Sequence, residues 1–350
     1  MNSLSIVIII IAIFGFLSSD KIKRNKRSRK FFCLITVIVL SLLSAIRADD
    51  VGTDTIGYIE EFEVVSRQSY ISLFRNYPSC FGYYMCCKFL NNHGLDVRFW
   101  FFLVALLFNS AVFYFIFVYS KNPVLSFALY IGSGIFAFSL AGMKQIVAMS
   151  FCIFSYCILQ KNKRIILSIL FVLLGSVFHQ SALFFLLILP FVRLNISKKW
   201  NVVFFSLLVV MIVGGSTFLR NFIGFLAEQG NKFGNYSDDV SELNFTQFYI
   251  YSLLVLTCFV FYRTLEREKI GGMVYAEIIA LAFFFLTTIV SSMFRMAYYL
   301  VFFLFALFPN VVSGIKDRPT SQLICMTSGI VFILYFALFS RIDYSFFFHL

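Results

Sequence analysis

Apolar runs separated by short polar segments make up most of the chain, and the clearest series extends from Phe138 to Phe191. The polar segments there are Gly142–Gln145, Lys161–Arg164 and His179–Ala182. Each apolar run between them is only about 14 to 17 residues long, whereas a straight membrane helix needs roughly 20. This pattern predicts membrane helices that are short, tilted or broken in the middle of the chain.

The same pattern over the whole chain predicts an all-α, polytopic membrane helix bundle of about twelve transmembrane helices, built as a single domain over residues 1–350. Two larger polar segments, residues 47–97 and 220–245, are predicted to be loops on the outer side of the membrane. Within the first loop, Asp54–Val65 and Phe81–Asn92 have helical patterns, and Phe81–Asn92 is amphipathic, as interfacial helices are. The predicted spans are Ser3–Leu17, Phe31–Ile46, Val97–Tyr119, Val124–Leu140, Lys144–Gln160, Ile165–Phe178, Ser181–Val192, Val202–Leu219, Phe245–Tyr262, Met273–Ser291, Met296–Val312 and Leu323–Phe339.

The composition excludes an ordinary soluble domain. The chain is 60% hydrophobic and 13% charged, whereas soluble domains are about 45–50% apolar and about 25% charged. Its 49 Phe and 18 Tyr residues fit a lipid-facing surface with aromatic belts at the membrane interfaces. The net charge of +12 follows from membrane topology, and no aromatic and basic surface stands apart from the spans. We therefore predict no nucleic-acid partner.

The distribution of positive residues predicts the orientation in the membrane. Nineteen of the 29 Lys and Arg residues fall in six connections, among them Lys21–Lys30 and Lys161–Arg164, which are therefore predicted to be cytoplasmic. Lys144 and His179 then lie at the outer side. Ser3–Leu17 precedes its basic run instead of following one, which is the reverse of a signal peptide, so we predict a retained first helix and both termini outside.

The eight cysteines show no spacing typical of a metal site, and we predict neither a metal nor a cofactor. Five of them lie in apolar runs, where cysteine acts as a small core residue. The other three, in the first outer loop, leave a disulfide open: Cys80, Cys86 and Cys87.

Four polar clusters are predicted to meet at the outer face, and their chemistry suits a diphosphate. They centre on the stretch from Arg47 to Asp54, on Lys144, on His179 and on Arg295. Cations grip phosphate oxygens, and a carboxylate or an imidazole can take a proton from a sugar hydroxyl. Other readings stay open. Arg47 and Arg295 can be interfacial anchors, and the acidic residues before and at Asp54 can be a hydrated loop or bind a divalent cation.

At these clusters the chain resembles the EpsG-like, or Wzy-type, polysaccharide polymerases. The matching segments are Arg47–Tyr58 (RADDVGTDTIGY), Gly142–Ala148 (GMKQIVA), Phe178–Ala182 (FHQSA) and Arg295–Tyr299 (RMAYY), in the family's order and spacing. Two departures stand out. Lys144 occupies a position where similar proteins usually have Arg, and Cys80-Phe81 precedes Gly82-Tyr83 where they tend to have an acid and a Pro.

The resemblance implies a membrane glycosyltransferase that joins undecaprenyl-diphosphate-linked oligosaccharide repeats at the outer face of the bacterial inner membrane. Its products would be O-antigen, capsule or exopolysaccharide. The reaction would need no nucleotide sugar, because the lipid-linked substrate is already activated. A flippase and a chain-length regulator are the implied partners. The matching positions imply Arg47, Lys144 and Arg295 as diphosphate-binding residues. They imply His179 or Asp54 as the catalytic base, and Tyr58, Gln145 and Tyr298 as residues that orient the substrate.

Two other classes of function stay open. A multispan transporter or flippase of lipid-linked oligosaccharides would use an ionisable group inside a span, and Glu277 is placed to be one unless it only makes a hydrogen bond between helices. A membrane sugar acyltransferase would use a buried His, but the segment around His179 lacks an acidic residue to act as a second partner.

Overall fold

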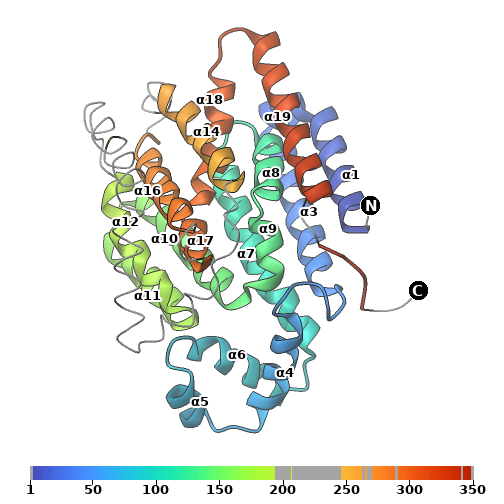
Figure 1. Cartoon of the computed structure of the whole chain (residues 1–350), viewed down its shortest axis with the longest axis vertical. Coiled ribbons are helices and arrows are strands. Elements are labelled where there is room, and N and C mark those ends of the chain that lie inside the picture. The colour runs from blue at the N-terminus through green and yellow to red at the C-terminus, as the bar shows by residue number, and fades with distance from the viewer. Residues whose placement is uncertain are drawn as a thin grey trace. The chain divides into compact units, whose positions relative to one another are not determined.

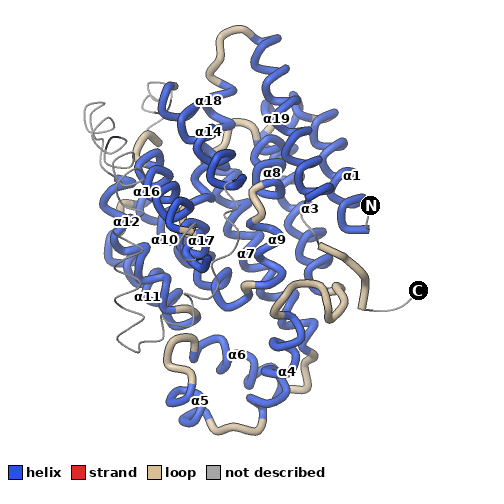
Figure 2. Tube along the Cα trace, in the orientation of Figure 1, coloured by secondary structure: helices blue, strands red, loops and turns tan. Residues whose placement is uncertain are grey.

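The computed structural model describes residues 3–193, 206, 246–261, 265, 270–287, 291–339 and 342–347. The predicted outer loop 220–245 lies outside these residues, and so does nearly all of the predicted span Val202–Leu219. The described elements are all helices, with one isolated antiparallel bridge between Arg47 and Phe346 (Figure 2). The all-α prediction is therefore confirmed for the part of the chain that is described. By its contacts the chain divides into a first unit, Met1–Leu186 with Ile315–Leu350, and a second unit, Leu187–Gly314. One domain over residues 1–350 stays a prediction.

The first unit consists of long apolar helices and a smaller group of polar helices. Helix α10 packs against α11, α3 against α7, and α8 against α19, while α4, α5 and α6 form a separate group beyond the ends of α3 and α7 (Figure 1). The elements are α1 (Ser3–Leu17), α2 (Ser19–Arg24), α3 (Lys26–Ala45), α4 (Thr55–Ser66), α5 (Tyr70–Asn76), α6 (Phe81–Asn92), α7 (Val97–Tyr119), α8 (Pro123–Gly132), α9 (Ile135–Ala141), α10 (Met143–Asn162), α11 (Ile165–Phe178), η1 (Gln180–Leu183) and α19 (Arg318–Phe339). Helix α12 (Phe184–Arg193) follows η1 along the chain.

Side-chain caps explain why several helices begin where the sequence predicts. Asn25 accepts a hydrogen bond from Arg27 N at 2.8 Å at the start of α3, and Asp96 accepts one from Arg98 N at 2.6 Å at the start of α7. Asn122 caps α8 in the same way. Caps of this kind satisfy backbone N–H groups that have no partner within the helix. The predicted bounds of Val97–Tyr119, Phe81–Asn92 and Ile165–Phe178 are confirmed.

The break in the middle of the chain occurs one helix earlier than the sequence pattern indicates. The predicted fourth span, Val124–Leu140, consists of α8 and α9, which meet at an angle of 53°. Gly134 lies between them with φ +79°, a conformation that glycine adopts without strain. The predicted fifth span, in contrast, is one continuous helix of 20 residues, because α10 begins at Met143 and includes Lys144 in its first turn.

Fewer helices than predicted are long enough to cross a membrane. In the described residues, five segments have the required length and apolar character, or six if the bent α8–α9 pair counts as one span. The predicted count of twelve is not confirmed. The physical reason is length, since a 14-residue helix such as α11 covers about 21 Å and the hydrocarbon core is about 30 Å thick.

The second unit begins at Leu187, inside α12. Its other described elements are α14 (Thr246–Val260), α16 (Met273–Leu286), η3 (Ser291–Met293), α17 (Phe294–Tyr298), η4 (Val301–Phe303) and α18 (Leu304–Ser313). Glu277 is buried in α16, and its Oε1 atom accepts a hydrogen bond from Leu304 N at 3.0 Å. The reading of Glu277 as a hydrogen-bonding group between helices is thus confirmed. All eight cysteines are free thiols.

Close packing between α8 and α19 generates a test of the fold. A Cβ atom at Gly132 would lie 2.6 Å from Phe332 Cβ and 2.8 Å from Phe332 O. We expect Gly132→Ala to lower the stability by about 1–3 kcal/mol, because a backbone atom cannot move aside cheaply. Thermal unfolding of the purified protein in detergent would measure this.

The matched control is Gly57→Ala in α4, where an added Cβ meets nothing within 4 Å. That change should raise stability by about 0.5–1 kcal/mol, because alanine favours a helix interior. An equal response of the two variants would contradict the packing of α8 on α19.

Candidate functional site

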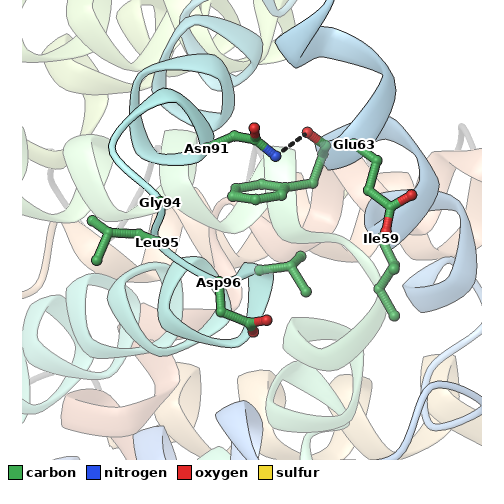
Figure 3. Close-up of a pocket in the computed structure, with 8 residues that line it drawn as sticks. Ile59, Glu63, Asn91, Gly94, Leu95 and Asp96 are labelled. Atoms are coloured by element: carbon green, nitrogen blue, oxygen red, sulfur yellow. Dashed lines mark hydrogen bonds between the residues drawn. The ribbon is translucent and has the colours of Figure 1, made fainter.

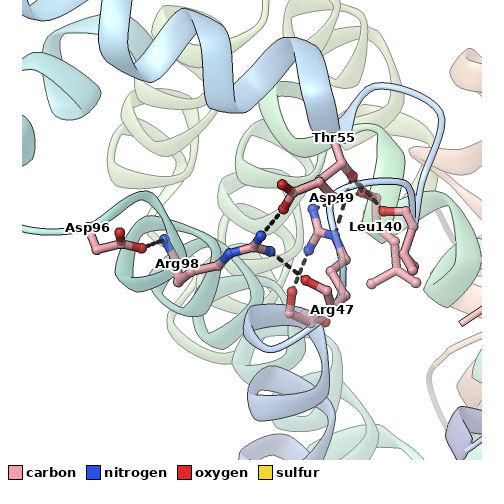
Figure 4. Close-up of polar contacts among 8 residues, drawn as sticks. Arg47, Asp49, Thr55, Asp96, Arg98 and Leu140 are labelled. Carbon is pink, nitrogen blue, oxygen red and sulfur yellow. Dashed lines mark hydrogen bonds and ion pairs between the residues drawn. The ribbon is translucent and has the colours of Figure 1, made fainter. Parts of the chain in front are cut away.

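Arg47, the first predicted phosphate-binding residue, is buried just after the end of α3. Its side chain is 1% exposed. Nη1 donates a hydrogen bond to Ser44 O at 2.5 Å, Nη2 donates to Leu140 O at 3.0 Å, and Nε donates to Thr55 Oγ1 at 3.4 Å (Figure 4). The guanidinium also lies 4.4 Å from the centre of the Phe101 ring. Its donors therefore face protein atoms that belong to three separate segments.

The surroundings of Arg47 are those of a buried residue that stabilises the fold. Burial, and next the charge of Arg98, lower the pKa of Arg47 to about 10. Arg98 Nη1 donates to the Arg47 carbonyl, and its Nη2 pairs with Asp49 (Figure 4). The Arg98 side chain is 19% exposed and that of Asp49 is 60% exposed, so this second arginine reaches the solvent. Arg98 was not among the residues predicted from the sequence. Its signal is its place in the first turn of α7, directly after the polar segment 47–97.

Gly52 lets the first matching segment pack closely against the residues just before the second matching segment. Gly52 has φ +92°, and a Cβ atom there would lie 2.6 Å from Leu140 O. Thr55 Oγ1 donates to Val51 O at 2.6 Å and closes the same turn. Since Arg47 also donates to Leu140 O, the loop from Arg47 to Thr55 folds onto the end of α9. This contact lies two residues before Gly142, where the second matching segment begins.

Lys144 lies in a cluster of ionic and aromatic groups contributed by α4, α6 and α10. Its Nζ atom is 2.9 Å from both carboxylate oxygens of Glu61 and donates to Tyr84 Oη at 2.6 Å. The rings of Tyr84, Tyr58 and Tyr83 lie 4.5, 5.3 and 5.6 Å from Nζ. We call these five residues the Lys144 cluster. Electron-rich ring faces attract a cation, so the cluster holds the ammonium group from several sides.

The ion pair of the Lys144 cluster, unlike Arg47, is partly open to solvent, whereas its three tyrosines are buried. The side chain of Lys144 is 19% exposed and that of Glu61 is 34% exposed. Tyr84 donates to Glu61 Oε1 at 2.8 Å. Burial, and next Glu61, raise the pKa of Tyr84, so its hydroxyl keeps its proton at neutral pH. The cluster thus presents a cation, a carboxylate and a phenol donor together.

Glu61 was not predicted from the sequence, although its spacing from Tyr58 was a signal for it. Glu61 follows Tyr58 by three residues, and both lie on the predicted short helix Asp54–Val65, which the structure confirms as α4. Residues three apart share one face of a helix. The face that carries Tyr58 therefore also carries the carboxylate that pairs with Lys144.

Two other predicted residues lie near this cluster in the sequence but differ in exposure. Asp54 is the exposed residue that precedes α4, and its side chain makes no capping hydrogen bond. Burial, and next the charge of Asp54, raise the pKa of Tyr58. Gln145 is 3% exposed, and its amide nitrogen lies 4.0 Å from Met149 Sδ.

His179 is the residue at which α11 ends and η1 begins. Its Nδ1 atom lies 2.5 Å from Ser181 Oγ, and Gln180 N donates to Ser79 O at 3.1 Å. A Cβ atom at Gly175 would lie 3.0 Å from Ala148 O, which shows how closely α10 and α11 pack. Gly175 is one turn before His179 and Ala148 is one turn after Lys144. His179 and Lys144 therefore lie at the same end of this helix pair.

The Gly82-Tyr83 pair, in the predicted outer loop, packs α6 close to the candidate site residues. A Cβ atom at Gly82 would lie 2.5 Å from Val177 Cγ1 and 3.1 Å from Val177 O, so α6 contacts the end of α11. Tyr83 is fully buried, with its ring centre 5.8 Å from that of Tyr58 and 5.3 Å from that of Trp100. The pair thus packs α6 beside both His179 and the Lys144 cluster, although no acid precedes it.

Arg295 and Tyr298 belong to α17 in the second unit, which is described separately. Arg295 is exposed, and its guanidinium carbon lies 6.0 Å from the centre of the Phe294 ring. Tyr298 is 4% exposed and packs edge-to-face against Phe284 and Phe294. Arg47, Tyr58, Lys144 and His179 all lie in the first unit.

An open cavity of about 360 Å³ lies between α4, the end of α6 and the start of α7 (Figure 3). Its lining combines carboxylate and amide groups with apolar side chains: Ile59, Phe62, Glu63, Asn91, Gly94, Leu95, Asp96 and Val97. Asn91 donates to Phe62 O at 3.4 Å across it. Such a lining can bind sugar hydroxyls and the apolar faces of sugar rings. Within the described residues, no three His, Cys, Asp or Glu side chains come together as metal ligands.

Comparison with protein families matches residues 30–349 to the EpsG family. This range contains every predicted site residue, from Arg47 to Tyr298. No curated protein and no solved structure matches the sequence.

A substitution of Arg47 can show whether this residue stabilises the fold or binds the substrate. Arg47→Met removes the donor to Ser44 O and the shorter of two hydrogen bonds to Leu140 O, and a buried group left unsatisfied costs about 1–3 kcal/mol. We expect a lower unfolding temperature and less folded protein by size-exclusion chromatography.

The control is Arg75→Met in α5, where the side chain is exposed and stability should not change. If Arg47→Met folds like the wild type but loses activity, Arg47 acts on the substrate and not as a structural tie.

Proposed function

This chain belongs to the EpsG family, and from that membership we propose that it is a polysaccharide polymerase of the bacterial inner membrane. It joins undecaprenyl-diphosphate-linked oligosaccharide repeats at the outer face. The products are glycans of the O-antigen, capsule or exopolysaccharide class. A flippase that delivers the repeats and a regulator of chain length belong to the same proposal as partners.

The Lys144 cluster is the observation that carries the proposal. It presents a partly exposed ammonium group that a single carboxylate, Glu61, neutralises in the absence of substrate. A diphosphate has more negative charge than one carboxylate, so it competes well for Lys144. Lys144 acts as a point charge on the phosphate oxygens. The Tyr84 hydroxyl, which donates to Glu61, becomes a second donor where a phosphate oxygen takes the place of that carboxylate. Arg295 is the second proposed diphosphate-binding residue, with Tyr298 beside it.

In this proposal Arg47 stabilises the segments that carry the site and does not contact the substrate. Its donors hold the end of α3, the turn before α4 and the carbonyl of Leu140. Those segments carry Tyr58 and Glu61 on one side and lead into Lys144 on the other. Arg47 therefore positions the Lys144 cluster, and the neighbouring Arg98 is partly exposed to solvent.

His179 is the proposed catalytic base. Ser181 contacts its Nδ1 atom at 2.5 Å and orients the ring. In this proposal the imidazole accepts a proton from the acceptor sugar hydroxyl. The hydroxyl oxygen then bonds to the anomeric carbon of the donor glycan, and the bond from that carbon to phosphate breaks. The electron pair leaves with the lipid diphosphate, whose charge Lys144 stabilises. Asp54 is the alternative base, but it is exposed, whereas His179 is partly buried and anchored.

The cavity between α4, α6 and α7 is the proposed place for a sugar ring of the repeat. Its residues Ile59, Phe62 and Glu63 lie on α4, the helix that also carries Tyr58 and Glu61. A carrier mechanism receives less support, because the buried Glu277 accepts a backbone hydrogen bond within its own unit.

Removing the charge of Lys144 tests the diphosphate site. In a deletion strain, we expect Lys144→Gln to reduce polymer about tenfold or more, since a charge-assisted hydrogen bond contributes about 1.5–3 kcal/mol. Lys144→Arg should keep most activity because the charge remains. A gel of the surface glycan, with membrane protein levels measured alongside, gives the result.

Arg67→Gln is the matched control, since Arg67 is an exposed cation of the same outer segment. A normal glycan ladder from Lys144→Gln at normal protein level would rule out the assigned role of Lys144.

His179→Ala tests the base. We expect single, unpolymerised repeats to accumulate, as in the deletion strain, while His93→Ala, an exposed histidine of the outer segment, gives a normal ladder. The same gel reports both variants. A deletion strain without any repeats at the outer face would instead indicate an export function, and a normal ladder from His179→Ala would leave Asp54 as the base to examine.

A further inference from the structure

A second cavity lies at the opposite end of α3 from Arg47, between α1, α2 and α3. Its volume is about 540 Å³. Its lining includes the polar side chains of Lys21, Asn25 and Arg27 and the aromatic rings of Phe14, Phe31 and Phe32. The cavity therefore offers cationic and hydrogen-bonding groups beside an apolar wall. The polymerase site does not use any of these residues.

The polar part of this cavity carries positive charge that is not neutralised. Lys21 and Arg27 are exposed, and no carboxylate pairs with either of them among the described residues. The neighbouring acid, Asp20, pairs with Arg318 at 3.2 Å. Lys21–Lys30 contains seven Lys and Arg residues in ten positions. An anion entering the cavity meets attraction from several cations and competes with no protein carboxylate.

The start of α3 adds to this preference for an anion. Asn25 accepts hydrogen bonds from Arg27 N at 2.8 Å and Ser28 N at 3.3 Å, so the first turn of this 20-residue helix borders the cavity. The N-terminal end of a helix carries partial positive charge. Arg27 also offers a planar group that can bind two phosphate oxygens at once.

The apolar part of the cavity continues into the lipid-facing surface. Phe14 is 53% exposed on α1 and Phe31 is 56% exposed on α3. Ile10 and Leu34, one turn farther along the same helices, are also exposed. In Figure 1 these two helices lie in the same part of the first unit. A ligand that fills both parts has an anionic head and an apolar chain.

We propose that the cavity between α1, α2 and α3 binds the phosphodiester headgroup of an anionic phospholipid. Lys21 and Arg27 contact the phosphate, Asn25 offers its amide to the headgroup, and an acyl chain lies along Phe14 and Phe31. Since basic connections stay in the cytoplasm, the lipid comes from the cytoplasmic leaflet. The site is independent of the polymerase proposal, because it lies at the other end of α3.

The test measures retained lipid by native mass spectrometry of the purified full chain in mixed micelles. Phosphatidylglycerol should be retained in preference to phosphatidylcholine. Lys21→Ala/Arg27→Ala should weaken phosphatidylglycerol binding about tenfold or more, because each basic residue near a lipid surface contributes about 1 kcal/mol. Arg24→Ala/Lys30→Ala removes the same charge from exposed positions outside the cavity and should retain the lipid.

Three outcomes would overturn the proposal. Equal loss in both double variants would mean general attraction to a basic segment. Binding of glycerol 3-phosphate as tight as that of phosphatidylglycerol would identify a soluble phosphate compound as the ligand. Unchanged retention in Lys21→Ala/Arg27→Ala would place the lipid elsewhere. If that variant does not elute as a folded protein, Lys21→Gln/Arg27→Gln keeps the side-chain length and is judged by the same criteria.

Discussion

The carbonyl oxygen of Leu140 is the contact on which the arrangement of the loop after α3 and of α4 depends. Arg47 donates to it at 3.0 Å, and Gly52 approaches so closely that a Cβ atom would lie 2.6 Å away. Because a buried guanidinium must find acceptors, this contact forces the loop after α3 to fold against the end of α9. The turn that results sets the start of α4, and α4 carries Tyr58 and Glu61 to Lys144.

The two cations Arg47 and Lys144 differ in burial, and this difference separates a structural role from a ligand-binding role. Arg47 is surrounded by carbonyl groups and an aromatic ring, so its charge supports the structure. Lys144 is held by Glu61 and three tyrosines but remains partly exposed, so its charge is available to a ligand that competes with Glu61. The ion pair with Glu61 keeps this partly exposed cation in place and neutralised.

Close helix contacts explain how residues from distant segments share this end of the molecule. Gly175 lets α11 approach α10, and Gly82 lets α6 approach the end of α11. His179 and the Lys144 cluster thus lie at one end of the first unit, while the basic residues around Lys21 and Arg27 lie at the other end of α3. In the membrane orientation that we propose, these ends serve different chemistry, with sugar and diphosphate outside and phospholipid headgroups inside.

The sequence by itself determined the helical membrane class and the bounds of several helices, among them α6, α7 and α11, because these depend on local periodicity, caps and composition. Glu61 had a sequence signal in its spacing from Tyr58, but its pairing with Lys144 joins residues 83 positions apart, and no local pattern contains such a contact. Tertiary structure alone decided that Arg47 is enclosed whereas Lys144 is accessible, and that the break falls at Gly134, before α10. The physical reason is that burial, ion pairing and close packing are properties of neighbours in space, which the chain brings together only when it folds.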